Sequence, residues 1–266
     1  MKQKSLISIL IYTGLTGFTH FLTAQQTHIS GPTGSGQFGY SVTVLANGNF
    51  VVVDHLYDEG STADVGAVYL YNGGTLALIS TLKGSTTNDQ VGSAGIIALT
   101  NGNFLVHSPF WDNGPATNAG AVTWCNGTTG ITGTVSSSNS LVGSTANDQI
   151  GGGGVIALTN GNFLVHSPGW DNGPATNAGA VTWCNGTTGN TGTISSSNSL
   201  VGSTAFDFVG NGGVTALTNG NYVVSSSSWN NGAIASAGAA TWGNGETGIA
   251  GAVSSSNSMV GSTALE

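Results

Sequence analysis

Apolar residues in this chain occur in short runs, and polar stretches rich in Gly, Asn, Ser and Thr separate them. Neither the runs nor the stretches between them show a helical period, so the pattern predicts short strands joined by turns. Within residues 82–141 it predicts four strands, at 82–86, 95–100, 103–109 and 120–125. Asn101-Gly102 lies between the second and third, and it predicts a hairpin with a type I′ turn. The pattern therefore predicts an all-β fold.

The predicted strands recur along the chain at a step of 59 residues. Gly84-Ser85-Thr86 returns three times, the last time as Gly261-Ser262-Thr263, and two tryptophans keep the same step. The first unit is shorter, with a step of 54 from Leu45 to Leu99. These steps divide residues 25–266 into units at about 28–80, 81–139, 140–198 and 199–257, followed by a closing strand at 258–264. Such long fixed periods are typical of modular arrays in which each unit packs against the next.

Four antiparallel strands per unit are typical of a β-propeller blade. A β-solenoid is the alternative, but its coils are much shorter than this period. The opening strand has five copies, including 28–33 and 259–263, whereas every other strand has four. We therefore predict a β-propeller-like array of about four four-stranded blades that is open or incomplete.

Three segments of the first unit carry a family resemblance. They are Phe38 to Val42, Asn47 to Val53 and Gly66 to Tyr71, and they resemble the FG-GAP repeat of integrin-type β-propellers. The later units resemble a bacterial repeat of unknown function from secreted and surface proteins. The resemblance covers residues 28–264 and implies a propeller fold at the cell surface.

The resemblance to FG-GAP repeats does not imply calcium binding in this chain. FG-GAP blades that hold calcium have several aspartates in the loop between their first two strands. The matching loops of this chain read Asn-Gly-Asn and contain no carboxylate, at 47–49, 101–103, 160–162 and 219–221. Calcium prefers six or more oxygen ligands, several of them charged. We therefore predict no cofactor.

The first 24 residues are typical of a secretory signal. Lys2 and Lys4 precede an apolar stretch at 6–22, and small residues end it at Ala24. A membrane anchor is the alternative, but polar residues interrupt the stretch. The sequence thus predicts a signal peptide at 1–24 and an extracellular mature chain that does not insert into a membrane.

The charge of the remaining chain limits its partners. Lys83 is its one basic residue, against eleven carboxylates in the sequence. Such a surface cannot neutralise phosphates, so nucleic acid and anionic lipid are not expected partners. Cys125 and Cys184 lie one period apart, too far for a disulfide between neighbouring units, and no zinc-like spacing is present.

The candidate ligand-binding residues are aromatic and acidic side chains on the loop that follows the predicted strand at 103–109 and its counterparts in the later units: Trp111, Trp170, Trp229, Asp112 and Asp171. An exposed ring beside polar groups can stack on a sugar, whereas a buried ring would act as a hydrophobic plug between blades. Asp89, Asp148 and Asp207 also recur at one loop position. They are either rim carboxylates or caps of their own turns.

A non-repeating acidic patch of the first unit is the candidate metal site: Asp54, Asp58, Glu59 and Asp64, with His55 among them. The alternative is a solvated acidic loop. His107 and His166 recur without a partner at metal-binding spacing. No Ser-His-Asp arrangement can be assembled from repeated positions.

These observations predict a secreted or cell-surface β-propeller repeat protein that acts as a binding or adhesion module without catalysis. Its expected partner is an extracellular glycan or protein. One alternative is a structural spacer in a larger surface assembly. Another is an extracellular hydrolase, which would require two carboxylates with separated pKa values in one cleft.

Overall fold

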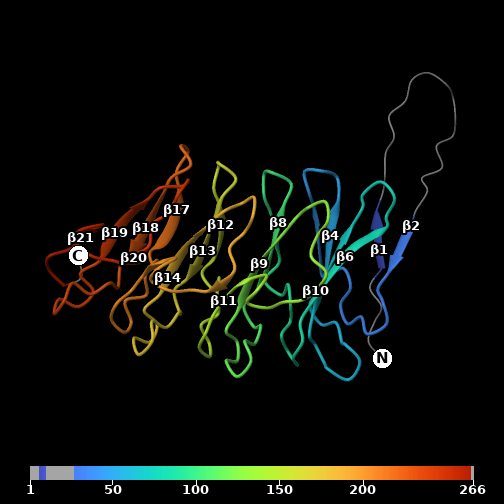
Figure 1. Cartoon of the computed structure of the whole chain (residues 1–266), viewed down its shortest axis with the longest axis horizontal. Coiled ribbons are helices and arrows are strands. Elements are labelled where there is room, and N and C mark those ends of the chain that lie inside the picture. The colour runs from blue at the N-terminus through green and yellow to red at the C-terminus, as the bar shows by residue number, and fades with distance from the viewer. Residues whose placement is uncertain (1–5, 10–26, 265–266) are drawn as a thin grey trace, which may run out of the picture.

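Four small sheets stand in a row in this computed structural model, which describes residues 6–9 and 27–264 (Figure 1). The first and last sheets lie at opposite ends of the row, so the described chain forms an open array and no closed ring. This confirms the predicted all-β, propeller-like array. The predicted signal segment 1–24 lies outside the described residues except for β1 (Leu6–Ile9), which pairs antiparallel with β2 (Thr27–Ser30).

Each sheet, here called a blade, is an antiparallel meander of four strands. Blade 1 contains β3 (Ser41–Val44), β4 (Phe50–Asp54), β5 (Ala67–Tyr71) and β6 (Leu78–Lys83). Blade 2 contains β7 (Ile96–Ala98), β8 (Phe104–Ser108), β9 (Ala121–Cys125) and β11 (Leu141–Val142). Blade 3 contains β12 (Gly154–Ala157), β13 (Phe163–Ser167), β14 (Ala180–Cys184) and β16 (Leu200–Val201). Blade 4 contains β17 (Gly213–Ala216), β18 (Tyr222–Ser226), β19 (Ala239–Gly243) and β21 (Met259–Val260).

The fourth strand of each blade explains the five copies of the opening strand. β11, β16 and β21 come from the opening segments of the units that follow, and each pairs with the third strand of the blade before it. The copy at 28–33 falls on β2, which pairs with β1 and lies outside the blades. Four of the five copies therefore complete a blade, and the copy at 28–33 is the one that does not.

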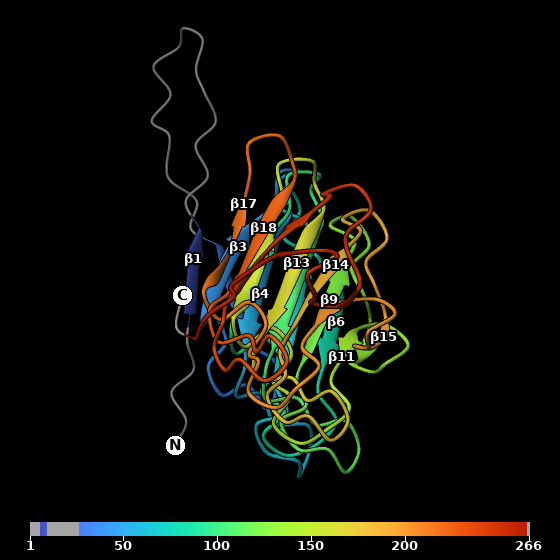
Figure 2. The ribbon, with the colours of Figure 1, turned by 90° about the vertical axis from the view of Figure 1, so that its left-hand side faces the viewer.

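A fifth, two-residue strand extends blades 1 to 3, where the sequence predicted only a loop. These strands are β10 (Gly133–Thr134), β15 (Gly192–Thr193) and β20 (Gly251–Ala252). Each belongs to the unit that follows the blade it extends, and it runs parallel to the last strand of that blade. The chain then returns to form the last strand of its own blade. Figure 2 looks along the row and shows the blades one behind another. Successive units are thus joined by backbone hydrogen bonds as well as by packing.

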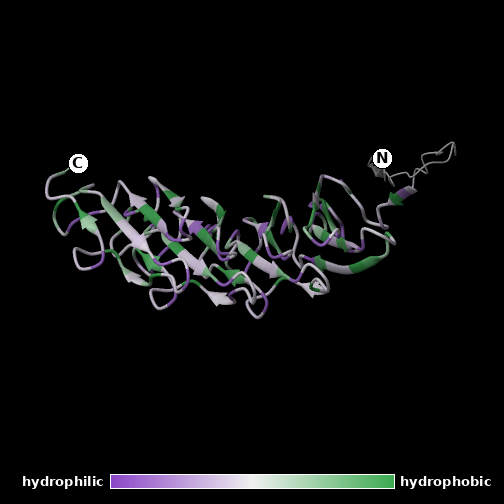
Figure 3. Ribbon diagram, turned by 90° about the horizontal axis from the view of Figure 1, so that it is seen from above, coloured by the Kyte–Doolittle hydropathy of each residue, from purple (hydrophilic) through white to green (hydrophobic). Residues whose placement is uncertain are grey.

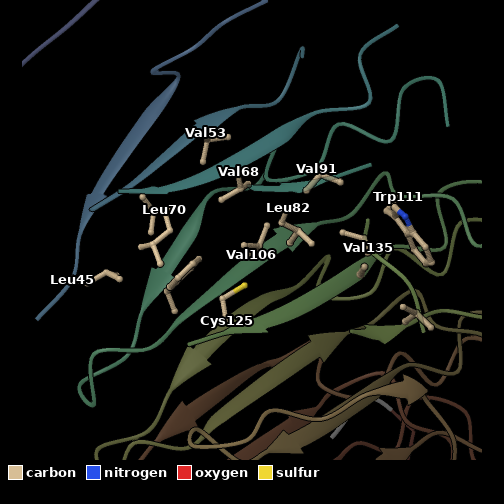
Figure 4. Close-up of a cluster of buried hydrophobic side chains, with 14 residues drawn as sticks. Leu45, Val53, Val68, Leu70, Leu82, Val91, Val106, Trp111, Cys125 and Val135 are labelled. Carbon is tan, nitrogen blue, oxygen red and sulfur yellow. The ribbon is translucent and has the colours of Figure 1, made fainter. Parts of the chain in front are cut away.

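The hydrophobic core lies between blades. We call the face that a blade turns to the following unit its trailing face, and the opposite one its leading face. Figure 3 shows apolar strand positions recurring along the row. In the cluster drawn in Figure 4, Val53 and Leu82 of blade 1 meet Val106 and Cys125 of blade 2. Two further clusters repeat this arrangement between blades 2 and 3 and between blades 3 and 4. Both faces of each inner blade are therefore buried, which accounts for strands without a polar alternation.

The predicted hairpins form, but the predicted turn type is wrong. Among the residues with positive φ are Gly102, at 85°, and its counterparts, but not Asn101, whereas a type I′ turn needs positive φ at both central residues. Gly102 N–H donates to Leu99 O, and Leu99 N–H donates to Asn103 O. This is the three-residue loop in which a type I turn is followed by a glycine bulge.

The Asn-Gly-Asn loops connect neighbouring blades. Asn101 Nδ2 donates to Gly186 O of the next unit at 2.8 Å, and Trp124 Nε1 donates to the same carbonyl at 2.9 Å. Asn160 and Trp183 repeat both bonds on Gly245 O, each at 2.8 Å. Buried polar groups need such partners, so these bonds complement the apolar packing at each interface.

Truncating the side chain at one strand position is expected to destabilise the protein more between blades than at the end of the row. Leu105→Ala should lower the free energy of unfolding by about 3 kcal/mol, because Leu105 is fully buried between blades 2 and 3. Val223→Ala, at the equivalent position of blade 4, should cost less than about 1 kcal/mol, since Val223 is only half-buried. Denaturant unfolding measures both, and equal losses would contradict burial between blades.

Candidate functional site

The repeated aspartates Asp89, Asp148 and Asp207 are buried and cap turns. The Asp148 carboxylate accepts hydrogen bonds from Ser144 N at 2.8 Å, Thr145 N at 2.8 Å, Thr145 Oγ1 at 2.6 Å and Asp171 N at 3.0 Å. Asp89 and Asp207 repeat this pattern in their own units. Both carboxylate oxygens face inward, so these groups organise the loop and do not form an open rim of charge.

The predicted ligand-binding residues Asp112 and Asp171 also bond their own loop. Asp112 Oδ1 accepts from Asn118 N at 2.7 Å, and Asp171 Oδ1 accepts from Asn177 N at 2.7 Å. Asn230 takes the same place in the fourth unit and accepts from Ser236 N at 2.9 Å. A neutral amide makes the same bond, so the position requires an acceptor oxygen and no charge.

Burial argues against sugar stacking on the three loop tryptophans. Trp111, Trp170 and Trp229 are only 3–4% exposed, and each belongs to the core between two blades. A ring covered on both faces by apolar side chains offers no surface to a ligand. They occupy the hydrophobic-plug position that the sequence left as the alternative.

The predicted metal residues of the first unit already have other partners. Asp54 is fully buried and accepts from Ser35 Oγ at 2.6 Å and from Gln37 N at 2.6 Å. Asp58 Oδ1 accepts from Asp64 N at 2.9 Å, while Glu59 pairs with Lys83 at 2.7 Å. No group of three His, Cys, Asp or Glu side chains in the described residues is placed to hold a metal ion. The carboxylates of Asp54, Asp58 and Glu59 thus take part in separate structural contacts, and Asp64 contributes its backbone N–H to one of them.

His107 and His166 are buried at the interfaces between blades. The Nε2 atom of each ring lacks a hydrogen-bond partner, and each ring lies against a glycine of the following unit, Gly151 or Gly210. Burial lowers the pKa of His107 to about 4 and also lowers the pKa of His166. Val53 takes the equivalent place in blade 1, so an apolar side chain suffices there.

An exposed aromatic irregularity of the repeat lies on the loop before blade 4, and the repeated pattern did not single it out. Phe206 and Phe208 stand where the third unit has Asn147 and Gln149. Phe206 is 57% exposed, and the two rings lie 5.9 Å apart with a tilt of 42°. The signal was present in the sequence as a double departure from the 59-residue repeat.

A family model described as a repeat of unknown function (DUF5650) matches four segments of the chain, at residues 44–93, 98–152, 157–211 and 216–266. The comparison with curated proteins found no match. In the part of the chain that the structure describes, no helix is suited to crossing a bilayer.

Removing a buried aspartate should destabilise its loop, whereas neutralising a loop aspartate should not. Asp148→Ala leaves several buried donors without an acceptor and should cost about 2 kcal/mol or more. Asp171→Asn keeps an acceptor oxygen, as Asn230 does, and should change stability by less than about 0.5 kcal/mol. Equilibrium denaturation compares the two variants. A large loss in Asp171→Asn would indicate that the carboxylate charge itself matters.

The buried histidines should make the array sensitive to mild acid. His107 titrates near its ordinary pKa of 6.5 when unfolded but near 4 when folded. The unfolded chain therefore binds more protons between these values, and stability falls as the pH is lowered through that window. His107→Val should remove roughly 2 kcal/mol of this loss between pH 7 and pH 4.5. Urea unfolding at both pH values measures the difference, and an unchanged pH slope would contradict it.

Proposed function

We propose that this chain, which belongs to the DUF5650 family of repeats of unknown function, is a secreted or surface-displayed binding module without catalytic activity. The segment 1–24, typical of a secretory signal, supports export. The array supports binding, because rigid repeats present extended surfaces on which loops are displayed. Kinship with the FG-GAP blades of integrin-type propellers is part of the same proposal.

The observation that carries the proposal is the aromatic pair Phe206 and Phe208, of which Phe206 is exposed and Phe208 is half-buried. Their backbone φ values are 64° and 45°, in the left-handed region. Asn147 adopts 65° at the equivalent position, and asparagine tolerates this region well. A bulky residue there costs of order 1 kcal/mol, and such strain is concentrated at functional positions. The fourth unit thus accepts backbone strain at Phe206 and displays that ring to solvent.

The backbone of the aromatic pair is held in place by the third unit. Phe206 N–H donates to Thr176 O at 2.9 Å and Phe208 N–H donates to Asn177 O at 3.1 Å, so the loop is held against the third unit. A ring fixed in this way loses little freedom when it stacks on a sugar. An extracellular glycan is therefore the proposed ligand class.

A structural spacer in a larger surface assembly is the second candidate. The observation that favours it is the extent to which repeated polar residues bond within the array, as Asp148 and Asn101 do. In a spacer, the aromatic pair would have no ligand. Binding measurements separate the two candidates.

Returning the pair to the residues of the third unit should abolish binding without loss of stability. Wild type should bind at least one glycan on a printed array, and Phe206→Asn with Phe208→Gln should weaken that binding at least tenfold. The double variant should unfold at an equal or higher denaturant concentration, because asparagine relieves the strain at 206.

The matched control is Phe110→Ser, which removes another exposed phenylalanine at a position where the fourth unit has Ser228. It should bind as wild type does. Unchanged binding by the double variant would refute the aromatic site. A wild-type chain that binds no glycan and no matrix protein would favour the spacer.

A further inference from the structure

The trailing face of blade 4 remains uncovered in the described residues. In blades 1 to 3 this face is buried against the following unit. In blade 4 the equivalent side chains are open: Trp242 is 52% exposed and Met259 is 76% exposed, whereas Leu141 and Leu200, the counterparts of Met259, are fully buried. In blade 4, the positions that form the other interfaces thus make an apolar surface that no other described residue covers.

Polar groups of this face lack the acceptor that their counterparts have. Asn101 and Trp124 both donate to Gly186 O, and Asn160 and Trp183 both donate to Gly245 O. In blade 4 the equivalent donors are the amide of Asn219 and the indole N–H of Trp242. Within residues 6–9 and 27–264 no carbonyl of a following unit accepts from them. A docked unit would supply that one carbonyl.

The edge of blade 4 lacks the strand that extends the other blades. β6, β11 and β16 each pair with a parallel two-residue strand, but the described residues give β21 no such partner. Beside β21 lies a shallow groove of about 320 Å³, lined in part by Ser225, Ala240, Met259 and Val260. An open strand edge beside an apolar groove is suited to strand addition.

We propose that the trailing face of blade 4 docks a further unit of the same repeat, one whose own leading face is uncovered. The three interfaces within the chain are the evidence for this occupant, since each shows an equivalent face covered by such a unit. The docked unit would offer an Asn-Gly turn carbonyl to Asn219 and Trp242, and a glycine-led strand to β21.

The interfaces also define which units fit. Gly189 and Gly248 lie directly on the tryptophan of the preceding blade, and an added Cβ would come within 2.5 Å of Trp124 Cβ and 2.6 Å of Trp183 Cβ. A glycine four residues after the turn asparagine is therefore required on the leading face of a docking unit. Units 2 to 4 all have it.

A second copy of this chain does not meet the requirement at its exposed end. Unit 1 has Leu76 where the other units have this glycine, and Leu76 packs on the leading face of blade 1. Phe50 and Tyr69 on that face are already buried, with Ile29 and Tyr57 packed against the same cluster. The leading face of blade 1 is thus closed by residues of the first unit, and the docking unit is one that lacks this cap.

Smaller side chains on the face indicate a reversible contact. Val223, Ser225 and Ala240 replace the Leu, His and Val that blades 2 and 3 carry at these positions. Less apolar area is therefore buried on docking than at an internal interface.

The test uses the full chain as bait and residues 84–266 as probe. The probe begins with unit 2, so its leading face is uncovered, and Trp242→Ala with Met259→Lys blocks its own trailing face. Sedimentation should show a saturable 1:1 complex, and oxidative footprinting should show protection of Trp242 in the bait. Gly130→Leu in the probe, which copies Leu76, should weaken the complex at least tenfold. The full chain alone should remain monomeric.

Circular dichroism establishes whether the probe is folded. A folded probe that leaves Trp242 unprotected, or a Gly130→Leu probe that binds equally well, would overturn the proposal. So would concentration-dependent protection in the full chain alone, because it would show that copies dock on each other.

If the probe does not fold, the test is a full chain extended after Thr263 by a copy of residues 205–263. Protection of Trp242 there supports docking of a repeat unit, and unchanged exposure refutes it.

Discussion

A single four-stranded sheet has two faces, and every blade of this array buries at least one of them against a neighbouring blade. The apolar clusters accordingly consist of the trailing face of one blade and the leading face of the next. The turn carbonyls of Gly186 and Gly245 accept side-chain donors from the preceding unit at these interfaces. Stability then depends on nearest-neighbour contacts, as in other linear repeat proteins. The rest of the structure, including which residues are free to bind anything, depends on this constraint.

The strands of the blades were predictable because their apolar runs are local and repeated. The two-residue strands were not, since Gly133–Thr134 has no alternating pattern and its partner, β6, lies about fifty residues away in sequence. The turn type was wrong for a related reason. Asn101 uses its side chain to reach the next unit, and a dipeptide rule for isolated hairpins does not include that contact.

The candidate site residues were harder to interpret, because recurrence and function point in opposite directions. Trp170 and Asp148 recur since they hold each unit together. Asp58 and Asp64 correspond to Asp112 and Asn118 of the second unit. The same hydrogen bond joins the two positions in both units, so the extra charge of Asp64 is the only irregularity. Charge alone therefore drew attention to a loop with an ordinary structural role. The exposed departure at Phe206 changes no charge, and its significance depends on a backbone angle that sequence does not state.

The parallel strands β10, β15 and β20 also determine how the array carries a mechanical load. Each connecting segment is bonded to the preceding blade before it closes its own. A pull on the two ends of the row therefore reaches the hydrogen bonds of two adjacent blades before it can extend the segment between them. Adjacent units then resist stretching jointly, and the connecting segment extends only after the hydrogen bonds of both blades have begun to break. A chain that holds a surface feature at a fixed distance benefits from such shared resistance.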